Sequence, residues 1–125
     1  MAQQGRDGRR RRRIVEIARV QLFLARHLGE VPPRADLAAM TGLSRSHFSR
    51  VFHSVTGTTV RDYVRHLRLQ HATALLRGST RSLTTIAVDC GFYDLAHFDK
   101  TFRREVGMSP LEFRHRVRQE AGNRT

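Results

Sequence analysis

Two similar six-residue stretches stand fifty residues apart in the chain, HFSRVF at 47–52 and HFDKTF at 97–102. Each places two phenylalanines four residues apart, which is the spacing of one face of a helix. At 100° per residue, Ser46, Arg50 and His53 fall on the face opposite the phenylalanines of the first stretch. The planar guanidinium of an arginine fits the O6 and N7 acceptors of guanine. The first stretch therefore predicts a helix with a buried aromatic face and a hydrogen-bonding face.

The second stretch repeats the aromatic face and changes the opposite one. Ala96, Lys100 and Arg103 lie opposite the phenylalanines, and Asp99 takes the edge position that Ser49 has in the first copy. An aspartate can accept a hydrogen bond from the amino group of cytosine, whereas alanine offers no hydrogen bond. The repeat predicts two related surfaces that differ in hydrogen-bonding capacity.

The charge of the chain points to a polyanionic partner. The formal net charge is +12 at pH 7, from 23 cationic and 11 acidic residues among 125. Such an excess favours nucleic acid as the partner first and an anionic membrane surface second. The simpler alternative is a basic protein without any such partner.

The cysteine count and the apolar pattern argue against a disulfide-bonded protein and against a membrane-spanning protein. Cys90 is the only cysteine, so no disulfide forms within the chain, which suits a reducing compartment. No apolar run approaches the roughly 18–20 residues that span a bilayer, and no secretory leader is recognisable. We therefore expect an intracellular protein with no membrane partner.

No set of residues resembles a metal site or a catalytic site. The histidines show no i, i+4 pair, the sequence contains no CxxC, and no nucleophile is set with a base, so we expect no metal, no cofactor and no enzyme. Cys90 precedes the turn residue Gly91 and is best explained as a small buried residue. The alternative is a reactive thiol, which would need exposure and a depressed pKa.

Apolar periodicity and cap signals predict an all-α fold of seven helices with no strand. Ser44, Thr59, Ser82, Asp94 and Ser109 each stand where a side-chain oxygen can cap the start of a helix. The expected helices lie at about 14–28, 37–40, 44–55, 59–77, 82–88, 94–105 and 109–119.

The two ends of the chain carry no apolar pattern. Residues 1–13 are expected to be a disordered basic arm, with five arginines at 9–13. That arm is either a solvated, self-repelling segment or a phosphate-binding extension through residues such as Arg11 and Arg12. Residues 119–125 are expected to be a frayed tail.

The repeat covers more than one helix. Short helix, glycine turn and second helix recur at an offset of 49 residues before the turn and 50 after it, because one residue is inserted after the turn glycine. The expected organisation is a helix-turn-helix subdomain at 14–57, a linker helix at 59–77 and a second subdomain at 82–118. A linker of about nineteen residues is about 28 Å long, near the ~34–36 Å between adjacent major grooves on one face of DNA.

Two stretches resemble the DNA-binding domain of the AraC/XylS family of bacterial transcription regulators. The more specific one runs from Ile86 to Arg114 and reads IAxxxGFxDxxxFxxxFRRExGxSPxxFR, and RLxxAxxLL at 68–76 matches as well. The resemblance covers about residues 14–118. It implies two helix-turn-helix subdomains, joined by a central helix, that insert the helices at 44–55 and 94–105 into adjacent major grooves of double-stranded DNA.

The resemblance also implies which residues contact DNA. In the second copy Leu95 and Ala96 lack hydrogen-bonding groups and Asp99 adds a negative charge, so that helix reads thymine methyl groups or DNA shape, or only anchors the protein. The implied base contacts are Arg45, Ser46, Ser49, Arg50, Leu95, Ala96, His97, Asp99 and Lys100. The expected phosphate contacts are Ser44, His53, Asp94, Arg103, Arg104, Arg11 and Arg12.

The sequence therefore predicts a sequence-specific transcription regulator that binds DNA as a monomer, works with RNA polymerase and resides in the cytoplasm at the bacterial nucleoid. Family members commonly carry a sensing or dimerising domain, for which this chain has no room, so it resembles the short stand-alone members or an excised domain. The main alternative is a non-specific architectural protein of the nucleoid. An enzyme with Cys90 as its nucleophile is the third hypothesis.

Overall fold

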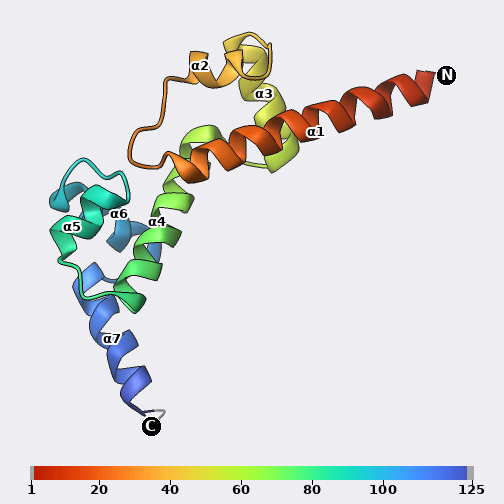
Figure 1. Cartoon of the computed structure of the whole chain (residues 1–125). Coiled ribbons are helices and arrows are strands. Elements are labelled where there is room, and N and C mark those ends of the chain that lie inside the picture. The colour runs from red at the N-terminus through yellow and green to blue at the C-terminus, as the bar shows by residue number, and fades with distance from the viewer. Residues whose placement is uncertain (1, 124–125) are drawn as a thin grey trace. The chain divides into compact units, whose positions relative to one another are not determined.

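The computed structural model describes the backbone of residues 2–123 and the side chains of residues 5–123. The described chain contains seven α-helices and no strand, which confirms the predicted all-α class (Figure 1). The helices are α1 (Ala2–Arg26), α2 (Arg34–Ala39), α3 (Arg45–Thr56), α4 (Val60–Gly78), α5 (Leu83–Asp89), α6 (Leu95–Val106) and α7 (Pro110–Asn123).

The chain divides into two units, and the division falls inside α4, between Arg65 and His66. Unit 1 holds α1, α2, α3 and the start of α4, while unit 2 holds the rest of α4 with α5, α6 and α7. The sequence predicts a separate linker at 59–77. In the structure each end of that helix belongs to a different unit.

The core of unit 1 forms around the aromatic face of α3. Phe48 and Phe52 are fully buried, and the ring of Phe52 meets the ring of Tyr63 on α4 edge-on at 5.5 Å between centroids. Both α1 and α2 pack against α3. The buried stripe of α1 consists of Ile17, Val20 and Leu24, and Leu28, just after the helix, is buried as well.

The core of unit 2 contains a longer series of aromatic rings. Phe98 and Phe102 of α6 are fully buried at positions equivalent to the phenylalanines of α3. The ring of Phe92 lies 4.9 Å from Phe98, and Phe102 meets Phe113 of α7 edge-on at 5.5 Å. Such arrangements add to the free energy gained by burying the rings. Aliphatic residues of α4 and α5 complete this core, namely Leu69, Ala72, Leu76, Ile86 and Ala87.

A buried arginine holds the connection between α4 and α5. Arg114 of α7 is 7% exposed, and burial lowers the pKa of its guanidinium. Its Nη1 donates to the carbonyl oxygen of Arg81 at 2.7 Å and its Nη2 to that of Ser79 at 3.3 Å. Its Nε donates to the carbonyl oxygen of Leu76 at 3.5 Å. One side chain thus binds carbonyls at the end of α4 and in the loop that follows.

All five predicted N-caps form. The hydroxyl of Ser44 accepts from the amide of His47 at 3.2 Å, and the carboxylate of Asp94 accepts from the amide of His97 at 2.7 Å. Each cap satisfies an amide that the first helical turn leaves without a partner. The hydroxyls of Thr59, Ser82 and Ser109 accept from the amides of Asp62, Thr85 and Glu112, each at 3.1 Å.

The two helix-turn-helix turns follow the same path up to one position. Gly42 and Gly91 both have positive φ, at 71° and 89°, a region that glycine enters without a Cβ clash. The residue after each glycine donates its amide to a helix carbonyl, Leu43 to Ala38 at 3.3 Å and Phe92 to Ala87 at 2.9 Å. The inserted residue that shifts the offset from 49 to 50 is then Tyr93, which is 89% exposed.

The ends of the chain differ from the sequence prediction. Residues 2–13 are helical, so the predicted disordered arm is corrected for that part, and Met1 lies outside the described residues. Helix α7 continues to Asn123, so 119–123 is helical as well, while 124–125 also lie outside. The sequence prediction assigned a helix only where apolar residues recur at helical spacing, and both ends of the chain lack such a pattern. Arginine, alanine and glutamine have high helix propensity and extend a helix that is already nucleated.

Some apolar residues within the predicted helices are exposed in the structure. They are Ile14 and Leu22 of α1, Val88 of α5, and Met40 just after α2. A helix on the surface of a small unit buries only one narrow stripe, and the periodic pattern in the sequence is wider than that stripe.

Candidate nucleic-acid interface

Helix α3 presents a polar face opposite its buried phenylalanines. Arg45, Ser46, Arg50 and His53 are exposed, and Ser49 lies half-buried at the edge of this face. The Ser44 cap fixes where the helix begins, so these side chains follow directly from the first turn. Residues near the N-terminal end of such a helix are the ones that reach base edges in a major groove.

The charge on α3 is purely cationic. The helix contains Arg45 and Arg50 and no acidic residue. Among the described residues neither arginine forms an ion pair, so both guanidiniums keep their donors available for a ligand. A planar fork of donors suits the edge of guanine or a phosphate.

Helix α6 presents the equivalent face with different chemistry. Leu95, Ala96, His97 and Lys100 are exposed, and Asp99 is half-buried. Three of the five positions that the family resemblance implies for base contact thus carry an apolar group or an acid. The remaining two are His97 and Lys100.

Asp99 is held by a cation on its own helix. Its Oδ2 accepts from Nε of Arg103 at 2.7 Å, one turn further on. The hydrogen bond from Asp99 and its negative charge raise the pKa of Arg103. The pair is exposed and partly screened by water. The ion pair nevertheless engages two groups predicted to contact DNA. These are the carboxylate of Asp99, predicted to accept from a base, and the guanidinium of Arg103, predicted to bind a phosphate.

The two histidines at the third helical position differ in their surroundings. In unit 2 the amide of Tyr93 donates to Nδ1 of His97 at 3.5 Å, and the ring packs edge-on against Phe92 at 5.7 Å. With Nδ1 as the acceptor, the proton of the neutral ring sits on Nε2. His47 is exposed, and its backbone amide binds the Ser44 cap.

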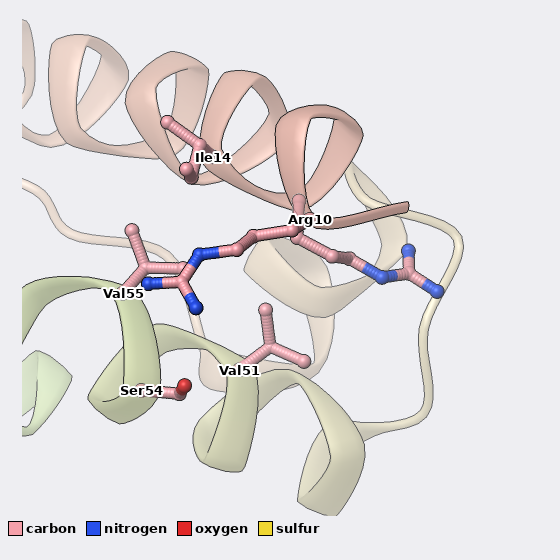
Figure 2. Close-up of a pocket in the computed structure, with 6 residues that line it drawn as sticks. Arg10, Ile14, Val51, Ser54 and Val55 are labelled. Carbon is pink, nitrogen blue, oxygen red and sulfur yellow. The ribbon is translucent and has the colours of Figure 1, made fainter. Parts of the chain in front are cut away.

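The basic segment of α1 lies beside the later part of α3. Arg11 and Arg12 are exposed on α1, and a hollow of about 190 Å³ separates that helix from α3. Figure 2 shows Arg10 and Ile14 on α1, and Val51, Ser54 and Val55 on α3. Arg13 pairs with Glu16 at 2.9 Å, which lowers the free charge of the segment. The hollow is lined by Arg10, Arg13, Ile14, Val51, Ser54 and Val55.

A cationic hollow in unit 2 was not identified from the sequence. Arg77, Arg81 and Arg118 surround an open space of about 500 Å³ at the α4–α5 loop. Arg81 also pairs with Asp89 at 3.0 Å, and Arg77 lies 5.3 Å above the ring of Phe113. Arg77 and Arg118 are 41 positions apart in the sequence and meet here only because α7 packs against the end of α4, so no local pattern could reveal the cluster.

Cys90 is buried, as the packing hypothesis expected. Burial first, and the charge of Asp89 second, raise the pKa of its thiol from 9.0 to about 11. The thiol is therefore protonated at pH 7, which is the opposite of what a nucleophile needs. The equivalent residue in unit 1 is Thr41, also buried, whose hydroxyl donates to the carbonyl oxygen of Ala38 at 2.7 Å.

Neither a membrane-spanning helix nor a metal-binding group stands out among residues 2–123. None of the helices described there is long and apolar enough to cross a membrane. In the same part of the chain, no three His, Cys, Asp or Glu side chains gather closely enough to hold a metal ion.

Comparison with known proteins places this geometry in a family. Residues 37–116 match a family described as a helix-turn-helix domain. A solved transcriptional regulator with an AraC-type DNA-binding domain, from Chromobacterium violaceum, superposes with a TM-score of 0.75 at 28% identity over 82% of this chain and 91% of that one. The chain belongs to the AraC/XylS family.

Other members of the AraC/XylS family match as well. The DNA-binding domain of AdpA, a global transcriptional factor solved in complex with a target DNA, superposes with a TM-score of 0.78 at 33% identity, over 83% of this chain and 94% of that one. The transcriptional activator RhaR of Yersinia pseudotuberculosis is 38% identical over 93 residues, covering 74% of this chain. The chain spans about a third of the length of that relative.

Proposed function

We propose that this chain binds double-stranded DNA at specific sequences and regulates transcription. The proposal rests mainly on α3, whose capped first turn presents Arg45 and Arg50 on an exposed face free of acids. The recurrence of the same architecture in α6 supports it. So does the likeness to the domain of AdpA, which was solved with a target DNA.

The proposed base contacts come from the outer faces of α3 and α6. On α3, arginine and serine side chains supply hydrogen bonds to base edges, while α6 supplies fewer. The positions proposed are Arg45, Ser46, Ser49 and Arg50 on α3, and Leu95, Ala96, His97, Asp99 and Lys100 on α6.

The proposed phosphate contacts are mostly cationic side chains, and they account for most of the affinity and for its salt dependence. We leave out Asp94, because its carboxylate only accepts hydrogen bonds and already binds the amide of His97. Ser44 keeps a hydroxyl proton to donate after capping the helix. The other contacts proposed are His53, Arg103, Arg104, Arg11 and Arg12.

We further propose that one chain occupies two adjacent major grooves as a monomer. Helix α4 supports this, because it continues from unit 1 into unit 2 as a single helix of 19 residues. A regulator of this kind acts at a promoter together with RNA polymerase, which places it on the nucleoid.

Selection of bound duplexes from a random pool at physiological salt tests the proposal. Two enriched blocks about one helical turn apart are expected if both helices read bases. One block would mean that α3 reads and unit 2 anchors. Tight binding with no enrichment, and a specificity ratio near one, would favour an architectural protein instead.

We propose no catalytic role for Cys90. Labelling of the native protein by a thiol reagent at pH 7 is expected to be slow, and to become fast once the chain is unfolded in urea. Rapid labelling of the native protein would contradict the buried, protonated state and revive the nucleophile hypothesis.

A further inference from the structure

An apolar hollow lies at the N-terminal end of α6, where the second helix-turn-helix would meet DNA. It has a volume of about 550 Å³ and is open to solvent. Leu95 and Ala96 stand on the first turn of α6, and Leu83 of α5 and Leu111 of α7 form the sides. Leu95 is 38% exposed and Leu111 is 51% exposed. The lining residues are Leu83, Leu95, Ala96, Asp99, Arg103, Ser109 and Leu111.

The equivalent surface of unit 1 is cationic. Applying the offsets of 49 and 50 residues that relate the two copies, each of the three leucines of the hollow replaces an exposed arginine. The exchange affects α5, α6 and α7 together, so it changes a whole surface and not one position. Leu83, Leu95 and Leu111 correspond in turn to Arg34, Arg45 and Arg61.

Hydrogen bonding is also reduced at this place. The one acceptor in the hollow that suits a base, the carboxylate of Asp99, binds Arg103 at 2.7 Å. Ser109 is buried, and its hydroxyl accepts from the amide of Glu112. Within the hollow, the groups of the first turn of α6 that remain open toward a ligand are therefore the apolar side chains of Leu95 and Ala96.

Thymine is the base that matches this surface. In the major groove it alone presents an apolar group, the C5 methyl. The rim of the hollow includes Arg103, and Lys100 lies on the same face of α6, so the surroundings suit a polyanion. These cations favour a negatively charged ligand over an uncharged apolar surface of another protein.

We infer that the second recognition helix reads thymine, with the methyl group seated against Leu95 and Ala96 and the deoxyribose against Leu83 and Leu111. The inference rests on the proposed function, because it requires α6 to lie in a major groove. The sequence leaves three alternatives open for α6: contact with thymine methyl groups, readout of DNA shape, or anchoring only. The inference selects the first.

Replacement of thymine by deoxyuridine tests the inference, since the change removes only the methyl group. The full chain is titrated with its selected duplex and with duplexes carrying one deoxyuridine at each thymine in turn. Loss of one buried methyl is expected to weaken binding about four-fold at one or two positions of the second half-site. The reverse exchange, cytosine to 5-methylcytosine in a site mutated from T to C, is expected to restore part of the loss.

Two matched variants separate the hollow from its counterpart. Leu95→Ala is expected to bring the thymine-to-deoxyuridine ratio at those positions close to one. Arg45→Ala, the same position in unit 1, is expected to weaken binding and leave that ratio unchanged. Circular dichroism of both variants verifies that they fold.

The outcomes of these titrations separate failure of the thymine inference from failure of the proposed sequence-specific DNA binding. Enriched sequences that bind equally well with deoxyuridine throughout the second half-site would overturn the inference and leave the function intact. A Leu95→Ala variant that keeps the full deoxyuridine penalty would also overturn it. Selection without any enriched sequence would contradict both the thymine inference and the proposed function.

Discussion

The two units share a scaffold and differ at the surface that the scaffold presents. Capped first turns, positive-φ glycines and paired phenylalanines occur at matching positions in α3 and α6. The exposed faces have diverged, with arginine and serine on α3 and leucine, alanine and a paired aspartate on α6. Backbone hydrogen bonds and buried rings fix the helix, so its outer residues can change without altering the fold.

The units also differ in how the last helix is secured. The position of Arg114 in unit 2 is occupied by Val64 in unit 1, and both side chains are buried. Valine needs only apolar neighbours, whereas the arginine needs the three carbonyls it binds. The second copy thus uses a polar network where the first copy relies on packing.

The largest expected effect is loss of one core ring. Phe52→Ala should lower the free energy of unfolding of unit 1 by about 3–5 kcal/mol, and Phe102→Ala should do the same in unit 2, because each leaves a large cavity. Amide hydrogen exchange followed by residue would show which unit opens. Equal loss of protection in both units from either change would mean that they unfold together.

A smaller effect is expected from removing the buried guanidinium. Arg114→Met should cost about 2 kcal/mol in urea unfolding, because carbonyls in the α4–α5 connection lose charged donors. The control is Arg116→Met, an exposed arginine on the same helix, which should change stability by less than about 0.5 kcal/mol. Equal effects would show that the carbonyl contacts of Arg114 contribute little.

The recognition faces are compared through one cation on each. Arg50→Ala should weaken binding to the selected site by about 1–3 kcal/mol and relax the preference at one base pair. Lys100→Ala, at the equivalent position on α6, should likewise weaken binding and relax the preference at one base pair of the second half-site, because Lys100 is a proposed base contact. Titrations at several salt concentrations measure both. If Arg50→Ala leaves binding unchanged, the assignment of the α3 face is wrong.

The smallest effect concerns the ion pair on α6. Asp99→Ala should strengthen binding to DNA of random sequence a few-fold at low salt, because it removes a negative charge and releases Arg103 for a phosphate. The gain should disappear as salt is raised. Glu120→Ala makes the same charge change on α7 and serves as the control. If both variants gain equally, the effect is one of net charge only.

Much of the fold follows from local signals in the sequence. The caps at Ser44 and Asp94, the turn glycines and the buried phenylalanines are each dictated by a few adjacent residues, and the structure has them where the pattern predicts. Local signals fail where helix formation does not require burial, as in residues 2–13, and where an apolar residue such as Val88 lies beside the buried stripe.

The candidate site is less accessible to such reasoning. Spacing on a helix identifies Arg50 as exposed and places Asp99 one turn from Arg103, yet it cannot show that three leucines from three helices meet. The carbonyl contacts of Arg114 span more than thirty positions. These features depend on tertiary packing, which no short window of sequence contains.

The inserted residue Tyr93 gives the second unit an intrinsic optical reporter. The chain has no tryptophan and two tyrosines, and the other one, Tyr63, lies on α4 against Phe52. Phenylalanine already occupies the position equivalent to Tyr63 in unit 2, at Phe113, so Tyr63→Phe is a conservative exchange. Tyrosine emission of that variant would then come from the recognition turn alone and follow its engagement without an attached dye.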